Sequence, residues 1–249
     1  MQYEIIVLGA TFAAAGIAQK YGDACLIAER STCAGYEFLN ALSFGTDYKN
    51  APLSEEGKML FKAFESKGAF QGDRICLYDC APLLYKQLAD KQVLLNTEIV
   101  SVKKTDSGFV CTLHGVSGYK TVTAKQVVDT RVHVETVQSK TLNFSLDVEK
   151  EFSGIDGMLA EKWGFERNMV MRCPLEKNAS FAEARNKILD AVLQLPEDIK
   201  LLSIADCFDY TLPETCETQA DGMVYLPSKA YKNPVLAFDA GVLFAGGAL

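Results

Sequence analysis

The chain has 249 residues, 49% of them hydrophobic, and a formal net charge of −7. This length suits one large domain or two interleaved ones, and the apolar fraction allows a substantial core. An acidic chain lacks the basic face that nucleic acids require, so we expect no nucleic-acid partner. No apolar run reaches membrane-spanning length and the first residues lack a basic leader, so the sequence predicts a cytoplasmic protein with no membrane span and no signal peptide.

The first 29 residues predict a strand, a tight turn, a helix and a second strand. Residues 3–8 and 24–28 are apolar runs typical of buried parallel strands. Between them, apolar residues recur at helical spacing over residues 13–21, and Gly22 ends the predicted helix. This order is the βαβ unit of a doubly wound sheet.

The turn of this unit has the spacing of a dinucleotide-binding loop. In such a loop the first glycine makes the turn, the second lets the diphosphate approach the backbone, and the third lets the helix pack on the strand. Here Gly9, Thr11 and Ala14 hold these positions, and the β-branched Thr11 stands where the phosphate approaches. Glu29 follows at the end of the second strand, where a carboxylate binds the adenosine ribose and disfavours NADP. A βαβ unit that binds no nucleotide is the alternative, because of Thr11.

The remaining chain predicts further helices and strands around an irregular segment, residues 31–53. Helices are predicted over residues 55–66, with Ser54 as N-cap, over 82–89, and from a capping box at Ser180 and Glu183 to about residue 193. The predicted strands are 93–95, 98–103, 109–113, 120–123, 126–129, 141–148, 168–172 and 200–205.

Neither the cysteines nor the histidines form a known catalytic or metal-binding pattern. The eight cysteines are scattered, so we expect reduced thiols and no metal site, with a shared role of Cys76 and Cys80 as the alternative. His114 is expected at the surface of a hairpin, whereas His133 could approach an active site. No Ser-His-Asp arrangement is present, and the catalytic residues stay unassigned.

The chain resembles the FAD-dependent oxidoreductases of the glutathione-reductase-like fold. Residues 9–29 carry this resemblance together with "LLNTEIVSVKKTDSGFVCTLHG" (94–115), similar to the strand and hairpin beside the adenine, and "AKQVVDTRV" (124–132), similar to the strand before Asp-Ala-Thr-Gly. The tail "GVLFAGGAL" is similar to the late segment that ends in Gly-Asp. The resemblance implies an α/β fold: a Rossmann-like FAD/NAD(P)-binding three-layer domain, residues 1–132 and 221–249, with an inserted α+β substrate domain, residues 133–220.

The resemblance also implies non-covalent FAD, with NAD or no cofactor as alternatives. Gly9, Thr11 and Ala14 would line the diphosphate. Glu29 would hold the ribose, Arg30 would flank it, and Ile99 would offer backbone to the adenine. Asp129 and Thr130 would lie beside the adenosine half. The implied cofactor-binding residues are Gly9, Ala10, Thr11, Phe12, Ala13, Ala14, Glu29, Arg30, Ile99, Asp129, Thr130 and Gly246. Tyr36, Trp163 and Arg172 are candidates for a substrate pocket.

Several positions depart from the family pattern. Thr11 and Val132 replace glycines, Gly247 replaces an acidic residue, and the sequence ends where a last helix is expected to begin. Cys33 lacks a second cysteine five residues later, where Phe38 stands, so a dithiol reductase is not expected. The predicted function is an FAD-dependent oxidoreductase acting on a small organic substrate, with a possible homo-oligomer or partner subunit. The alternative is a non-catalytic subunit or binding protein that has lost its cofactor, and a thiazole-synthase-like protein is a third reading.

Overall fold

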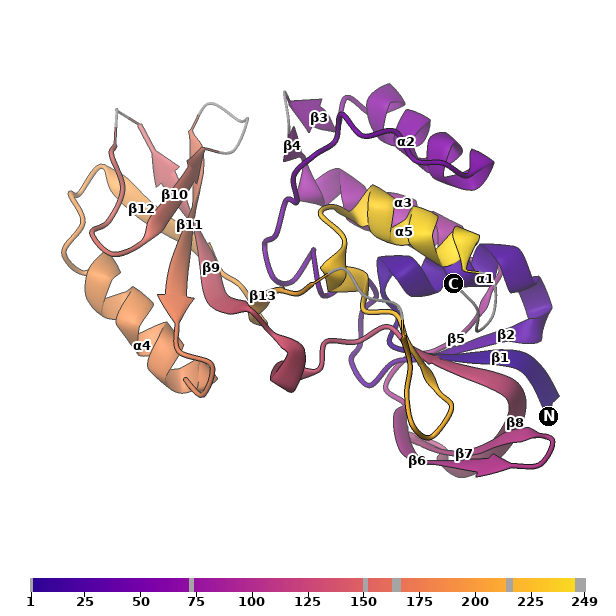
Figure 1. Ribbon diagram of the computed structural model, residues 1–249. Coiled ribbons are helices and arrows are strands. Elements are labelled where there is room, and N and C mark those ends of the chain that lie inside the picture. The colour runs from indigo at the N-terminus through magenta and orange to yellow at the C-terminus, as the bar shows by residue number, and fades with distance from the viewer. Residues whose placement is uncertain (1, 72–73, 150–151, 163–166, 214–216, 245–249) are drawn as a thin grey trace.

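The computed structural model describes residues 2–71, 74–149, 152–162, 167–213 and 217–244 (Figure 1). Within them the chain forms two large sheets and one two-stranded ribbon, β3 (Phe70–Gln71) with β4 (Arg74–Ile75). The first sheet contains parallel strands from both ends of the described chain, and the second is entirely antiparallel. The chain is therefore a mixed α/β protein, as the sequence predicts.

The first sheet has the strand order β14-β15-β8-β1-β2-β5, with β6 and β7 attached through β8. The strands from β15 to β5 pair in parallel, and β6, β7 and β8 form an antiparallel meander. The strands are β1 (Gln2–Leu8), β2 (Cys25–Ala28), β5 (Gln92–Leu94), β6 (Glu98–Thr105), β7 (Gly108–Gly115), β8 (Gly118–Asp129), β14 (Glu217–Thr218) and β15 (Val224–Tyr225).

Helices cover one face of the parallel strands and the meander covers the other (Figure 1). Ile5 and Val7 of β1 point into the core beneath the helices, whereas Ile6 and Leu8 point into the core beneath the meander. This alternation explains why β1 is apolar at every buried position. The helices on this part of the chain are α1 (Phe12–Tyr21), α2 (Glu55–Ser66), α3 (Leu77–Leu88) and α5 (Pro234–Leu243), with the 3-10 turns η1 (Gly22–Ala24), η2 (Val134–Thr136) and η3 (Ser228–Ala230).

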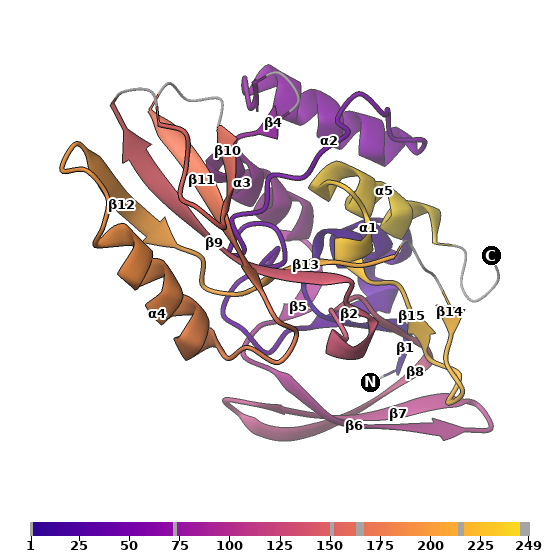
Figure 2. The ribbon, with the colours of Figure 1, turned by 60° about the vertical axis from the view of Figure 1, so that its left-hand side comes forward.

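The second sheet lies beside the first and carries one helix, α4 (Phe181–Val192), on a single face (Figure 2). Its order is β10-β11-β9-β12, and β13 pairs with the other end of β9. Alternate residues of β9, such as Leu142, Phe144 and Leu146, pack beneath α4. The strands are β9 (Ser139–Val148), β10 (Leu159–Lys162), β11 (Asn168–Leu175), β12 (Ile199–Ile204) and β13 (Asp209–Thr211).

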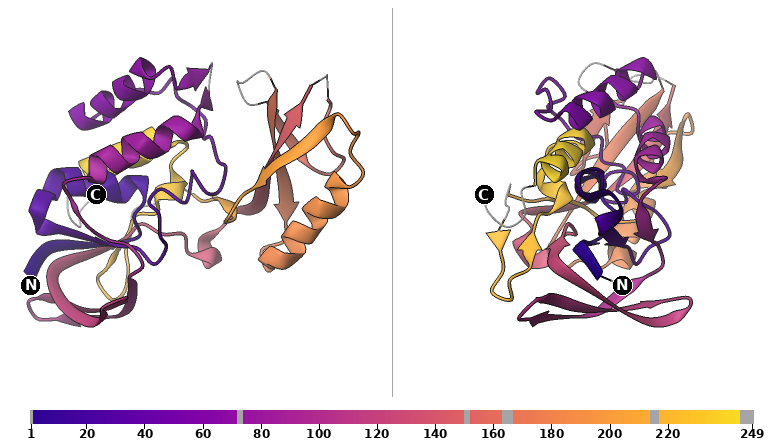
Figure 3. Two further views of the ribbon diagram at one scale, coloured as in Figure 1. Left: turned by 180° about the vertical axis from the view of Figure 1, so that it is seen from behind. Right: turned by 90° about the vertical axis from the view of Figure 1, so that its right-hand side faces the viewer.

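Helix α5 (Pro234–Leu243) is not predicted from the sequence, and it includes the first residues of the tail assigned to the late Gly-Asp segment. Residues 234–243 form a ten-residue helix that lies against α1 (Figure 3). The two helices meet backbone to backbone, because a Cβ on Gly16 would lie 2.0 Å from the carbonyl oxygen of Phe238, and one on Gly241 would lie 2.0 Å from that of Ala13. The sequence shows no amphipathic pattern here because α5 is buried on most sides.

Three other boundaries differ from the predicted ones. Helix α3 begins at Leu77 and contains Pro82 in its interior, so proline does not mark its first turn. Strand β8 is continuous over twelve residues, although the sequence predicts two shorter strands. Strands β10, β13, β14 and β15 are two to four residues long, too short for a periodic pattern.

Candidate functional site

The carboxyl ends of β1 and β8 lie side by side where the chain reverses its course across the first sheet. From β1 the strand order runs outward through β2 to β5, and the chain then returns to add β8 and β15 on the other side of β1. In open parallel sheets, ligands bind outside the strand ends at such a switch point. A ligand is therefore expected above the ends of β1 and β8.

Gly9 turns the chain from β1 into α1. Its φ of 93° lies in the left-handed region that favours glycine. A Cβ at this position would lie 2.7 Å from Cγ of Arg131 and 3.2 Å from Oγ1 of Thr130. The turn therefore requires glycine both for its conformation and because Arg131 and Thr130 lie directly over it.

Three side chains accept hydrogen bonds from the N–H groups of residues 12–14 at the start of α1. Thr11 Oγ1 accepts from residue 14 at 3.1 Å, Ser228 Oγ from residue 13 at 3.3 Å, and Glu37 Oε1 from residue 12 at 2.9 Å. A helix N-terminus offers unpaired N–H groups and a partial positive charge, so it attracts anions. Here Glu37, from the segment between β2 and α2, supplies a carboxyl group from the chain itself.

Glu37 is 4% exposed and lies deep in the fold. Its Oε1 also accepts a hydrogen bond of 2.7 Å from the Ser228 hydroxyl. Its Oε2 is buried and has no hydrogen-bond partner among the residues that the structure describes. Burial raises the pKa of Glu37 to about 7, against the lowering effect of the hydrogen bonds from Phe12 and Ser228. A carboxyl group that titrates near neutrality is thus placed at the head of α1.

Lys229 links the loop after β2 to the second sheet. Its Nζ donates to Ser43 Oγ at 2.6 Å and lies 2.9 Å from Asp209 Oδ1 and 4.4 Å from the centre of the Phe38 ring. Asp209 in turn accepts a hydrogen bond of 3.1 Å from the Asn143 amide on β9. These contacts fix the loop after β2 between the two sheets.

Glu29 closes the end of β2 and is 2% exposed. Its Oε2 accepts the N–H of Ala10 at 3.0 Å, and its Oε1 accepts the N–H of Ser31 at 2.7 Å. Each carboxylate oxygen has a further lone pair, so the group can also accept a hydroxyl of a ligand. Glu29 therefore holds the glycine loop in place and still faces the cavity described below.

Asp129, at the end of β8, contacts the side chains of Arg131 and His133. Arg131 donates to both of its oxygens, at 2.9 and 2.8 Å, and His133 Nε2 lies 3.0 Å from Oδ2. Burial opposes ionisation of Asp129, but the hydrogen bonds from Arg131 and His133 outweigh it and lower the pKa to about 2. The same hydrogen bond raises the pKa of His133, whose ring stacks on Tyr225 at 4.3 Å.

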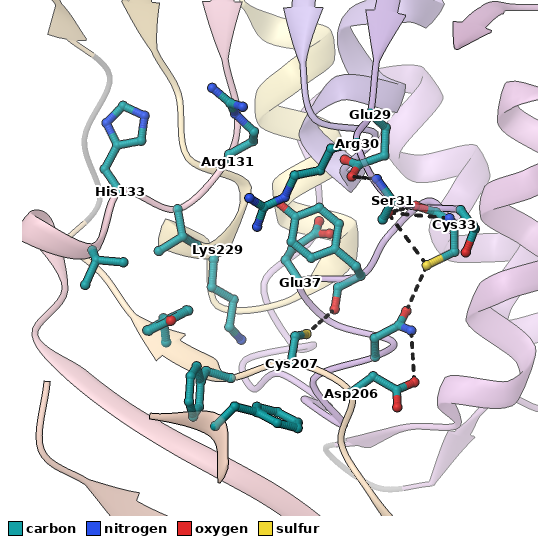
Figure 4. A pocket seen from close by; sticks show the side chains of 18 of the residues that line it. Glu29, Arg30, Ser31, Cys33, Glu37, Arg131, His133, Asp206, Cys207 and Lys229 are labelled. Atoms are coloured by element: carbon teal, nitrogen blue, oxygen red, sulfur yellow. Dashed lines mark hydrogen bonds between the residues drawn. The ribbon is translucent and has the colours of Figure 1, made fainter. Parts of the chain in front are cut away.

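A cavity of about 820 Å³ lies between the two sheets and joins these groups (Figure 4). Arg30 and Lys229 extend into it, with Arg131 and His133 on one side and Cys33 and Asp206 on the other. Its wall also includes four aromatic side chains: Tyr36, Phe181, Phe208 and Tyr210. A cavity with an aromatic wall and both signs of charge suits a small organic ligand.

Of the predicted cofactor residues, Glu29 and Arg30 line the cavity. The lining does not include Asp129, Thr130 or the buried loop residues Gly9, Ala10, Thr11, Phe12, Ala13 and Ala14, although Ala10 and Phe12 donate to the lining residues Glu29 and Glu37. The Thr11 hydroxyl donates to Thr130 at 2.8 Å and caps α1, so it points into the fold. Ile99 lies on β6, packed against the meander core and away from the cavity lining. Gly246 lies outside the described residues.

Some of the other candidate residues line the cavity and some do not. Tyr36, Cys33, Val132 and His133 line the cavity. Arg172 does not, since it pairs with Glu161 at 3.0 Å on the second sheet. His114 packs on Tyr119 in the meander, and Trp163 and Gly247 lie outside the described residues. The described residues contain no cluster of three or more His, Cys, Asp or Glu side chains that could hold a metal, and none of their helices is long and apolar enough to cross a membrane.

Sequence reasoning missed Glu37, Ser228 and Lys229. Glu37 falls in the segment predicted as irregular, where no periodicity or motif marks it. Ser228 and Lys229 follow the two-residue strand β15, directly before the helix α5 that the sequence did not predict. The short apolar run 223–226 before a proline was the available signal of a further strand end.

No protein-family model matches the chain, and no curated protein matches it. Solved structures do match, at low identity. BexE, studied for oxidation during BE-7585A biosynthesis, has 14% identity and a TM-score of 0.65 over 97% of this chain. The p-nitrophenol 4-monooxygenase PnpA from Pseudomonas putida DLL-E4 has 11% identity and a TM-score of 0.64 over 97%. Aklavinone-11 hydroxylase, in a complex with FAD and aklavinone, has 11% identity and a TM-score of 0.53 over 96%.

This chain is similar to these proteins in fold. It spans 60% of the length of BexE and of aklavinone-11 hydroxylase, and 77% of the length of PnpA. The likeness extends across both sheets, because nearly the whole of this chain is aligned. The parallel and antiparallel sheets thus have the arrangement of these oxygen-inserting and oxidising enzymes.

Proposed function

We propose that this chain is an FAD-dependent oxidoreductase that acts on a small organic substrate. The observation that carries the proposal is the cavity between the sheets, which begins at Glu29 and Arg30 and reaches an aromatic wall on the second sheet. The fold similarity to aklavinone-11 hydroxylase, solved with FAD and aklavinone, supports this choice of cofactor and of a small organic substrate. Residues 1–132 and 221–249 would form the Rossmann-like cofactor domain, and residues 133–220 the inserted substrate domain.

The residues present fit the adenosine end of FAD. Glu29 lies at the end of β2 with lone pairs left for the ribose hydroxyls, and Arg30 extends into the same cavity. The diphosphate end has backbone donors at the head of α1, but the N–H of Phe12 already binds Glu37. The site therefore fits the diphosphate when the Glu37 side chain moves aside.

FAD, when bound, would supply the redox chemistry, and the protein would supply position and electrostatics. The aromatic side chains on the second sheet would hold an organic substrate and exclude water from it. Lys229 and Arg30 would place positive charge at the centre of the cavity. The Asp129–Arg131–His133 cluster would hold the loop after β8 rigid at the cavity edge.

The test is flavin retention by the purified protein. After incubation with FAD and removal of the excess, the wild-type protein should keep the visible absorbance of bound flavin. Glu29→Ala should lose it, and Glu65→Ala, which removes an exposed carboxylate on α2 outside the cavity lining, should keep it. A wild-type protein that stays colourless, with no rise in its unfolding temperature on FAD addition, would overturn the proposal.

A second candidate is a non-catalytic subunit or binding protein that holds no cofactor. One observation favours it: all three N–H groups of residues 12–14 already have acceptors within the protein. A colourless wild-type protein would support this candidate, and the search would then turn to a partner chain.

A further inference from the structure

Glu37 occupies the position at the head of α1 that an anionic ligand would take. The N–H of Phe12 points to its Oε1 at 2.9 Å, and the Ser228 hydroxyl bridges the same oxygen to the next N–H of the helix. Phosphate oxygens use the same two kinds of donor, a backbone N–H and a hydroxyl, at helix N-termini. A carboxyl group and a phosphate therefore compete for one set of donors.

Glu37 does not act as an ordinary helix cap. The N-cap of α1 is Thr11, whose hydroxyl already accepts a bond from the helix. A cap also has no need for a second, unpaired oxygen, yet Oε2 of Glu37 is buried and has no hydrogen-bond partner among the described residues. An unpaired buried acceptor carries a desolvation penalty that an exposed cap avoids. The residue itself lines the cavity.

We propose that Glu37 is a built-in competitor for anionic ligands at the N-terminus of α1, so that a diphosphate-bearing ligand binds only when the Glu37 side chain leaves this position. The inference deepens the proposed function and rests on it for the identity of the ligand. Glu37 lines the cavity, so a rotated side chain has open space on that side. Lys229, which is paired with Asp209, lines the same cavity, and its charge favours the ionised form of Glu37.

The competition makes Glu37 a determinant of ligand choice. A ligand with a diphosphate, such as FAD or ADP, must displace Glu37 and meets a negative charge as it does so. A ligand without phosphate, such as riboflavin, leaves Glu37 in place. Removal of Glu37 should therefore strengthen the binding of phosphate-bearing ligands alone.

The experiment measures binding of FAD, ADP, riboflavin and inorganic pyrophosphate to four proteins at pH 8 by calorimetry and thermal shift. The proteins are the wild type, Glu37→Ala, Glu37→Gln and the control Glu65→Gln, an exposed position on α2 outside the cavity lining. Glu37→Ala frees the Phe12 N–H and removes the negative charge of the carboxylate. It should therefore bind FAD and ADP at least about tenfold more tightly than the wild type. Glu37→Gln keeps the acceptor but loses the charge, so its gain should be smaller.

Riboflavin binding should not change in either Glu37 variant, and Glu65→Gln should match the wild type with every ligand. Equal FAD affinity of the wild type and a folded Glu37→Ala would overturn the role of Glu37 and leave the proposed function standing. If no protein binds FAD or ADP but Glu37→Ala gains pyrophosphate, the role of Glu37 holds and the proposed function fails. If a folded Glu37→Ala binds no anion more tightly than the wild type, the inference is overturned. If Glu37→Ala does not fold, the same comparison is made with Glu37→Gln.

Discussion

Helices α1 and α4 both begin with a hydroxyl N-cap and a carboxyl group, but the two N-termini are built differently. In α4, Ser180 and Glu183 cap each other within the helix's own first turn, at the surface. In α1, Thr11 is the N-cap, and the carboxyl group comes from Glu37, 25 residues beyond Phe12 and buried. Hydrogen bonds from Ser180 lower the pKa of Glu183, whereas burial raises that of Glu37 to about 7.

We infer from this difference that Glu183 stabilises its helix, whereas Glu37 fills a binding position. An exposed carboxylate keeps most of its hydration, so its hydrogen bonds to the helix add to stability. A buried carboxyl group loses its hydrogen bonds to water and needs protein donors to replace them. Glu37 has such donors at only one of its two oxygens. Such an imbalance is typical of functional sites, where stability is reduced for the sake of binding.

The largest expected effect is on the pH dependence of stability. Since the pKa of Glu37 is higher in the folded than in the unfolded chain, its contribution is fully present below about pH 4.5 and is lost as pH rises through about 7. A rise from 4.5 to about 7 corresponds to about 3 kcal/mol. The stability of Glu37→Gln minus that of the wild type should therefore increase between pH 4 and pH 8, by up to about 3 kcal/mol.

Urea unfolding of both proteins across this pH range measures the effect. His133 titrates in both proteins, so the difference between the two profiles isolates Glu37. Parallel profiles would show that the Glu37 carboxyl group has an ordinary pKa and that its burial carries no penalty.

The next effect concerns the cap of α1 itself. Thr11→Gly removes a buried hydroxyl that caps the helix and donates to Thr130, so it should destabilise the protein by about 2 kcal/mol. Thr11→Ser keeps the hydroxyl and should lose only about 1 kcal/mol, for the buried methyl group. Urea midpoints measure both losses, and an equal loss in the two variants would mean that the hydroxyl does not matter.

The smallest effect on stability should come from Glu183 at the start of α4, and its pH dependence should be opposite in sign to that of Glu37. The pKa of Glu183 is lowered by its hydrogen bonds to Ser180, so its contribution is present above about pH 4.5 and is lost as pH falls. Glu183→Gln should therefore lose stability at pH 7 and match the wild type in strong acid. Thermal unfolding at both pH values checks this, and a gain at pH 7 would contradict the assignment of the capping box.

Local patterns in the sequence predict the N-terminus of α4 in full. For α1 they predict the turn and the helix but not the contact with Glu37. The capping box of α4 is contained in four consecutive residues, and the β1–α1–β2 unit follows from apolar periodicity and Gly9. Glu37 reaches α1 only through the tertiary fold, from a segment with no periodic pattern, so no local signal marks it. Helix α5 escaped prediction for a related reason: a helix buried on most sides has no polar stripe to reveal its period.

The backbone contact between Gly16 and Gly241 bears on the order in which the protein assembles during synthesis. Helix α1 leaves the ribosome well before α5, which covers it, because most of the described chain lies between them. Until α5 arrives, the nascent βαβ unit exposes the apolar side of α1, and such surfaces recruit chaperones. Ser228 is made only shortly before α5, so the donors that hold Glu37 come together only after the second sheet has been synthesised.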